Sequence, residues 1–165
     1  MLMLTSPDFA PGEPIPQRFT CDGQNVSPAF RWAGVPEGTE ELILVCEDPD
    51  APRGPFLHWA AYGISPSRDF LHAGYADGAD APGFHQAVND FGKAGYGGPC
   101  PPVGDAPHSY RFRLSAHERA LAGVSAGTTC REIVEMATPH VIDSAEIIGV
   151  YARARPAAIE QERAG

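Results

Sequence analysis

The sequence has few basic residues and gathers none of them into a cluster. Its 165 residues include 12 lysines and arginines against 21 aspartates and glutamates, which gives a formal net charge of -9. Proteins that bind nucleic acid or anionic membrane surfaces usually carry basic patches. The shortage of basic residues therefore argues against both kinds of partner.

Long apolar runs are also missing. Residues 1–4 are apolar, but the polar segment 5–8 follows at once, so the start of the chain has neither the core of a signal peptide nor a membrane span. We therefore predict a cytoplasmic protein without an integral membrane segment.

Sequence motifs typical of metal or cofactor binding are absent as well. The cysteines are far apart and form neither a C-x-x-C pair nor a Cys/His zinc spacing. They are Cys21, Cys46, Cys100 and Cys130. We expect free thiols in a reducing compartment. The sequence also contains no nucleophile elbow, P-loop or HExxH motif, so no cofactor and no metal are predicted.

What the sequence has in excess is glycine and proline. With 18 glycines, 17 prolines and long stretches without helical periodicity, it favours a loop-rich β protein over a helix bundle. The length suits one domain. We predict that this domain covers residues 1–155 and that residues 156–165 form a mobile tail.

Several segments have the pattern of β-strands. We expect strands at residues 42–46, 59–64, 108–114 and 146–153, and an edge strand broken by proline within residues 1–20. Residues 65–98 are rich in glycine and alanine and lack a period, so they are expected to wall or cover a site. The one clear helix follows Thr129, which forms a capping box with Glu132, and Pro139 stops it. This order predicts an antiparallel, mainly β fold.

An acidic, proline-rich loop joins the strands at residues 42–46 and 59–64. It contains Asp48 and Asp50 and leads to His58. Prolines restrict the backbone, so a loop of this kind can hold side chains at a site. The alternative is a simple Asx-type turn, in which each aspartate accepts a hydrogen bond from a nearby backbone N–H.

A second histidine begins the strand at residues 108–114. Strand alternation puts His108 and Tyr110 on one face and Ser109 on the other. Two imidazoles and a phenol can all donate hydrogen bonds to an anion. An aspartate nearby could orient a histidine, or it could receive the ammonium group of a ligand.

The two polar segments together resemble the signature blocks of a known family. Asp48-Pro49-Asp50-Ala51-Pro52 followed by His58-Trp59, and Gly98-Pro99-Cys100-Pro101-Pro102 followed by His108-Ser109-Tyr110, are similar to those of the phosphatidylethanolamine-binding proteins. The match is closest to the bacterial, Raf-kinase-inhibitor-like branch. Residues 21–28 and 89–92 resemble other short motifs of that branch, and the resemblance runs from about residue 5 to residue 153.

The resemblance implies a large and a small antiparallel sheet, one or two short helices near the C-terminus, and a small anion pocket. Carried over by motif, the pocket residues are Asp48, Asp50, His58, Pro101, Pro102, His108 and Tyr110. One position departs from the pattern, because the family often has a basic residue where Ser109 stands. We expect the pocket to persist without that charged contact at its rim.

The function implied is binding of a small anionic or phosphorylated ligand, such as a phosphoethanolamine-like head group, with possible regulation of a protein partner. One alternative is a hydrolase that uses His58, His108 and an aspartate, with or without zinc. Another is inhibition of a kinase or protease through the surface, and related bacterial proteins suggest a homodimer. Cys100 lies in the pocket loop, where a small packing residue is favoured over a reactive thiol.

Overall fold

The computed structural model describes residues 1–154, which form two antiparallel sheets and one short α-helix. The smaller sheet has three strands in the order β1-β2-β5, and the larger has six in the order β6-β7-β4-β3-β8-β9. The strands are β1 (Met3–Thr5), β2 (Phe30–Ala33), β3 (Glu41–Asp48), β4 (Phe56–Ile64), β5 (Phe70–Leu71), β6 (Asp80–Ala81), β7 (Phe84–Gln86), β8 (His108–His117) and β9 (Val141–Tyr151). The helix is α1 (Cys130–Ala137), and the short 3-10 helices are η1 (Gln17–Phe19) and η2 (Thr138–His140).

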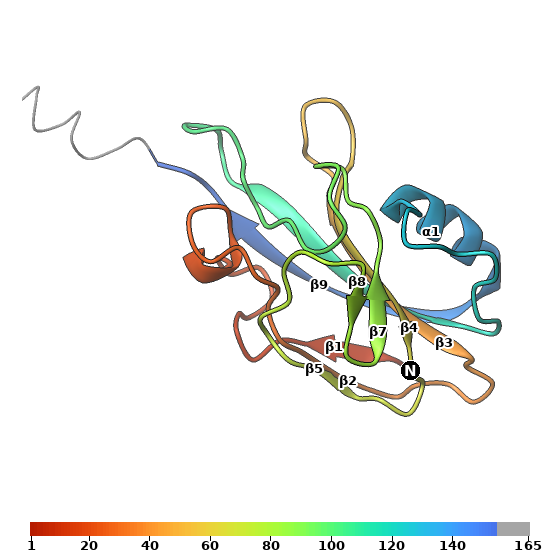
Figure 1. Ribbon diagram of the computed structural model, residues 1–165. Helices are drawn as coiled ribbons and strands as arrows, with labels where there is room; N and C mark the ends of the chain where they lie inside the picture. The colour runs from red at the N-terminus through yellow and green to blue at the C-terminus, as the bar shows by residue number, and fades with distance from the viewer. Residues whose placement is uncertain (155–165) are drawn as a thin grey trace, which may run out of the picture.

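The main core lies between the two sheets. Alternate residues of β3 and β8, such as Leu44 and Phe112, face the small sheet and are fully buried. The ring of Phe30 from β2 lies 4.9 Å from that of Phe112 and 6.4 Å from that of Trp59. The opposite face of the large sheet carries α1, which buries Ile133 and Cys130 against Ile43 and its neighbours (Figure 1).

The pairing of the central strands decides where polar residues meet. Cys46 of β3 pairs with Trp59 of β4 on one side and with Phe112 of β8 on the other. Because both neighbours run antiparallel to β3, the end of β3 lies beside the starts of β4 and β8. The loops at residues 49–55 and 99–107 therefore leave the sheet at the same end (Figure 1).

The mainly β fold, the two sheets and the helix near the C-terminus confirm the expectations from the sequence. The capping box is present, because the Thr129 side chain accepts from the Glu132 backbone N–H and Glu132 accepts in return from Thr129. The helix ends at Ala137, two residues before Pro139. Between residues 65 and 98 only short strands occur.

Several boundaries were wrong. Strand β3 extends to Asp48, which is therefore a strand residue and not a loop residue, because its backbone pairs with Phe56. Strand β9 begins at Val141 rather than at residue 146. Its first half contains polar residues and lacks the apolar pattern by which the strand was predicted. Within residues 1–20 the edge strand is only β1 (Met3–Thr5), and residues 17–19 form η1 instead of continuing it.

The difference at η1 has a local cause. Pro16 precedes the turn with a φ of -55°, and both the backbone N–H and the side chain of Thr20 donate to the Gln17 carbonyl oxygen. A 3-10 turn satisfies these groups locally, whereas an edge strand would need a partner strand. The place at the edge of the small sheet is taken by β1.

No helix within residues 1–154 is long and apolar enough to cross a membrane. The predicted tail at residues 156–165 lies outside the described residues.

Candidate functional site

A pocket opens at the end of the large sheet where β3, β4 and β8 meet. It has a volume of about 140 Å³. Its lining residues are Asp48, Ala51, Pro52, Phe56, His58, Phe91, Cys100, Pro101, Pro102, His108 and Tyr110. Of the seven residues expected at a site, six line this pocket and Asp50 does not. These residues come from segments up to 62 positions apart in the chain (48 to 110). The pairing of β3 with β4 and β8 brings these segments together at one end of the sheet.

His108 is held between two carboxylates. Its Nδ1 lies 2.7 Å from Oδ2 of Asp48, and its Nε2 lies 3.3 Å from Oδ2 of Asp105. Burial by itself lowers the pKa of His108, but the hydrogen bonds and negative charges of Asp48 and Asp105 outweigh it and raise the pKa above its ordinary value. Both ring nitrogens are then donors, and the imidazolium form is favoured.

His58 has the opposite character. Its Nδ1 lies 2.6 Å from the carbonyl oxygen of Gly97, so Nδ1 carries the proton and donates it. Burial lowers the pKa of His58, which keeps the ring neutral near pH 7. A neutral ring that donates through Nδ1 offers Nε2 as an acceptor. His58 is therefore not the anion donor that the sequence suggested.

Tyr110 brings the donor that His58 lacks. Its ring lies edge-on to His58 at 5.4 Å and stacks at 6.4 Å from the ring of His108. Burial and the negative charge of Asp48 raise its pKa, so the phenol stays protonated. Within the described residues its hydroxyl has no hydrogen-bond partner although it is not sealed from solvent. It can therefore donate to a molecule in the pocket.

Asp50 lies outside the pocket lining and connects its loop to the start of β8. Its Oδ2 accepts from the backbone N–H of Ser109 at 2.9 Å. Asp48 contributes its second oxygen to the same loop, since its Oδ1 accepts from the Asp50 backbone N–H at 2.8 Å. The Asx-type turn is thus present at Asp48, together with its contact to His108. Ser109 points away from His108 and Tyr110, as the alternation predicted.

Cys100 forms a disulfide with Cys21, which contradicts the expectation of four free thiols. The two cysteines are 79 residues apart, so their spacing in the sequence gave no signal. The fold brings them together because the backbone N–H of Cys21 donates to the Pro99 carbonyl oxygen at 3.1 Å. The disulfide ties a wall of the pocket to the segment after η1. Cys46 and Cys130 are free and buried.

Two residues that line the pocket, Phe56 and Phe91, were missed in the sequence, as was Asp105, which contacts His108 from outside the lining. Asp105 lies on a loop three positions before His108. That spacing predicts a side-chain contact in a helix, but it predicts none in a loop. Phe56 and Phe91 form an aromatic wall, with ring centroids 4.7 Å apart and Phe91 half-exposed. In the sequence, residues 89–92 resemble only a short family motif, and nothing there indicates where the ring of Phe91 lies.

The geometry offers little to a metal ion. Within residues 1–154 no group of three or more His, Cys, Asp or Glu side chains is arranged to hold one. Both nitrogens of His108 already face carboxylates, and Nδ1 of His58 faces a carbonyl oxygen. Zinc binding by His108 would require one of its two hydrogen bonds to be broken, whereas Nε2 of His58 is free.

Comparison with known proteins gives consistent matches. A family model described as phosphatidylethanolamine-binding protein matches residues 5–152. A UPF0098 protein of Aquifex aeolicus is 39% identical over 148 residues, which cover 90% of this chain and 86% of that protein. LppC of Mycobacterium tuberculosis, named as a candidate lipoprotein, is 38% identical over 91% of this chain and 70% of its own length.

A solved structure has the same fold. The crystal structure of Escherichia coli YbcL, described as a member of the mammalian PEBP family, aligns with a TM-score of 0.85 and 34% identity. The alignment covers 92% of this chain and 98% of YbcL.

Proposed function

This chain belongs to the phosphatidylethanolamine-binding protein family, and on that premise we propose that its pocket binds a small anion of the phosphate type. The observation that carries the proposal is the free hydroxyl donor of Tyr110 beside the cationic ring of His108. A charged donor and a neutral donor that share a pocket can hold two oxygens of one anion.

The remaining polar groups favour a ligand that also carries donors. Nε2 of His58 can accept from a protonated phosphate oxygen or from an ammonium group. The carboxylates of Asp48 and Asp105 add negative charge on the other side of His108. A zwitterionic phosphomonoester such as phosphoethanolamine suits this mixture of charges better than a simple anion does.

Several residues in and beside the pocket have a part in this proposal. Asp48 keeps His108 protonated, and Asp50 fixes the loop at residues 49–55 to the start of β8. Pro101 and Pro102 form a rigid wall. Phe56 and Phe91 offer an apolar surface for the organic part of the ligand.

Asp105 competes with the ligand for His108. Its side chain is 45% exposed and reaches Nε2 only at 3.3 Å, a long contact for a charged pair. An incoming anion has to displace this carboxylate before it can accept from Nε2. Because this contact is weak, displacing the carboxylate costs little free energy.

Catalysis is the less favoured function. A hydrolase would need a base beside an activated water or hydroxyl, and the only ring nitrogen with a free lone pair in the pocket is Nε2 of His58. Regulation of a protein partner and assembly into a homodimer stay predictions from the family resemblance. For location, the disulfide argues for an oxidising compartment rather than the cytoplasm that we predicted.

Calorimetry at pH 6 tests the proposal with sulfate, whose charge is constant, and with phosphoethanolamine. We expect both to bind to the parent protein and to bind more weakly to His108→Gln, which can donate but cannot carry charge. His72→Gln is the control, because His72 is an exposed histidine outside the pocket. Equal affinities for parent and His108→Gln, in proteins that melt alike, would show that the charge of His108 does not contribute to anion binding. No binding of either anion to the parent would overturn the proposal.

A further inference from the structure

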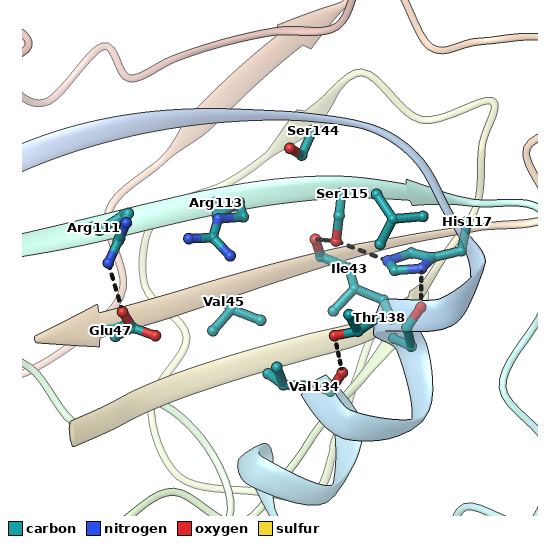
Figure 2. A pocket seen from close by; sticks show the side chains of 12 residues that line it. Ile43, Val45, Glu47, Arg111, Arg113, Ser115, His117, Val134, Thr138 and Ser144 are labelled. Carbon is teal, nitrogen blue, oxygen red and sulfur yellow. Dashed lines mark hydrogen bonds and ion pairs between the residues drawn. The ribbon is translucent and has the colours of Figure 1, made fainter. Parts of the chain in front are cut away.

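A second groove lies on the other face of the large sheet. It runs over β3, β8 and β9 beside the C-terminal end of α1 (Figure 2). Its volume is about 150 Å³, and it shares no residue with the pocket at the end of the sheet. Side chains alternate along β3, so Glu47 faces this groove while Asp48 faces the pocket.

The floor of the groove is apolar because α1 covers only part of this face. Ile43 lies beneath the helix and is buried, whereas the next outward residue of β3, Val45, is only partly covered. Val134 and Ala137 of α1 form the side wall. A six-carbon group fits a cavity of this size, since an engineered cavity of about 150 Å³ binds benzene.

Polar groups at the inner end satisfy one another. Oγ of Ser115 lies 2.8 Å from Nε2 of His117, and Nδ1 of His117 lies 3.1 Å from the carbonyl oxygen of Ala137 (Figure 2). The carbonyl fixes the proton on Nδ1, so Nε2 accepts from the serine hydroxyl. The last turn of α1 adds the partial negative charge of its carbonyl oxygens. An anionic head group has no partner at this end.

The outer end has the opposite character. Arg111 and Arg113 extend from β8 toward β3 over the groove (Figure 2). Arg111 pairs with Glu47 at 2.8 Å, yet its Nε is the only buried side-chain nitrogen or oxygen without a partner in the part of the chain described. Buried donors without an acceptor are costly and uncommon.

Arg113 has still fewer acceptors. Its one acidic neighbour is Glu146, which approaches Nε at 3.7 Å, and both side chains are 44% exposed. Neither terminal nitrogen of Arg113 has a hydrogen bond or a carboxylate partner within residues 1–154. On the β3 side Arg113 lies opposite Val45, which offers no acceptor. The N–H donors of its two terminal nitrogens are therefore available to a carboxylate.

We propose that this groove is a second binding site, which takes a small organic carboxylate with an apolar body of about six carbons. The carboxylate accepts from the terminal nitrogens of Arg113, and the body lies over Val45 toward Val134. Only this orientation pairs the charge and buries the apolar part, because the inner end repels an anion. Glu146 moves aside or shares Arg113 with the ligand, which its long contact and exposure permit.

Hexanoate is a suitable probe, and hexan-1-ol is its uncharged counterpart. In a two-dimensional ¹H–¹⁵N NMR titration, hexanoate is expected to shift the amides of Val45, Arg113 and Ser115 in a saturable way. Hexan-1-ol should bind at least tenfold more weakly. Arg113→Gln should weaken hexanoate binding about tenfold or more, since it removes a charge-assisted pair of hydrogen bonds.

Three further variants separate the possible explanations. Arg119→Gln makes the same charge change at an exposed position outside the groove and should leave the affinity unchanged. His108→Gln should also leave it unchanged, because that residue belongs to the other pocket. Val45→Phe fills the groove and should abolish the shifts. The proposal is overturned by hexan-1-ol binding as well as hexanoate, by unchanged affinity in a folded Arg113→Gln protein, or by the absence of saturable shifts in the groove.

Discussion

His108 donates its Nδ1 proton to Asp48 across 2.7 Å, although 60 residues separate them in the chain. Each residue lies at the end of a strand, and β3 and β8 run antiparallel as neighbours in the large sheet. The pair therefore exists only when these two strands are in register. It keeps the imidazole of His108 protonated by raising its pKa, and several of the predictions depend on it.

The pKa values of the two pocket histidines should be shifted in opposite directions from about 6.5, the usual pKa of histidine. Carboxylate partners raise the pKa of His108 despite its burial, whereas burial lowers the pKa of His58. NMR of the imidazole protons against pH should find His108 charged and His58 neutral near pH 6.5. Asp48→Asn should lower the pKa of His108, because it removes the closer carboxylate. A pKa of His58 above that of His108 would contradict the assignment.

Stability should follow the same titration. A group whose pKa is higher in the folded protein stabilises it fully below the unfolded value, and the stabilisation is lost as pH rises through the folded value. His108 therefore favours folding below about pH 6.5, and its contribution disappears at more alkaline pH. Urea unfolding of the parent and of His108→Gln from pH 6 to pH 9 measures this contribution. The difference in free energy of unfolding between the two proteins should shrink as pH rises.

Sulfate affinity should fall as pH rises through the raised pKa of His108. The anion binds the imidazolium form, and loss of its proton removes the charge. Phosphate is a poor probe here because a phosphate monoester changes its own charge near pH 6. Calorimetry across this range should give a pH-dependent affinity for the parent and a flat one for His108→Gln. A flat profile for the parent would mean that the histidine does not bind as a cation.

Asp105→Asn should strengthen sulfate binding at pH 6, where Asp48 still keeps His108 protonated. The change removes the carboxylate that competes for Nε2. Because exposed ion pairs contribute about 0.2 to 1 kcal/mol, the gain should be about 1.4-fold to fivefold. Asp69→Asn makes the same charge change at an exposed position away from the pocket and is the control. Equal gains in both variants would assign the effect to net charge alone.

Tyr110→Phe should weaken sulfate binding and leave the fold nearly intact. It removes one hydroxyl donor and keeps the buried ring, so the loss should be about 0.5 to 3 kcal/mol. Tyr62→Phe removes a hydroxyl from a tyrosine of β4 that lies outside the pocket, and it should not change affinity. Calorimetry together with a thermal melt of each variant is the measurement. Equal affinity in all three proteins would remove Tyr110 from the site.

The disulfide can be checked by alkylation and mass spectrometry. In the native protein neither Cys46 nor Cys130 should react, because both are buried and burial raises the pKa of Cys130 to about 12. Without reductant, denaturation should expose two thiols, and with reductant it should expose four.

Loss of the disulfide should also destabilise the protein. Replacing both Cys21 and Cys100 with serine should lower the free energy of unfolding by about 2 to 4 kcal/mol, because the unfolded chain gains freedom. Denaturant titration measures this change. The matched variant is Cys46→Ser, which alters a buried thiol and keeps the disulfide. Unchanged stability in the double variant would mean that the bond is absent in solution.

The sequence by itself determined the fold class and most of the pocket residues, because those signals are local. Apolar alternation identified β8, and the Thr129 and Glu132 spacing identified the start of α1. The two proline-rich blocks pointed to Asp48, His58, His108 and Tyr110 before any of them could be placed in space.

Only the tertiary structure decided what these residues do to one another. Which histidine is charged depends on whether a carboxylate or a carbonyl faces it, and those partners come from Asp48 and Gly97, far away in the chain. The disulfide between Cys21 and Cys100 has the same origin. Protonation, disulfide pairing and burial are properties of three-dimensional contacts between segments that are distant in the chain, and these contacts form only when the chain has folded.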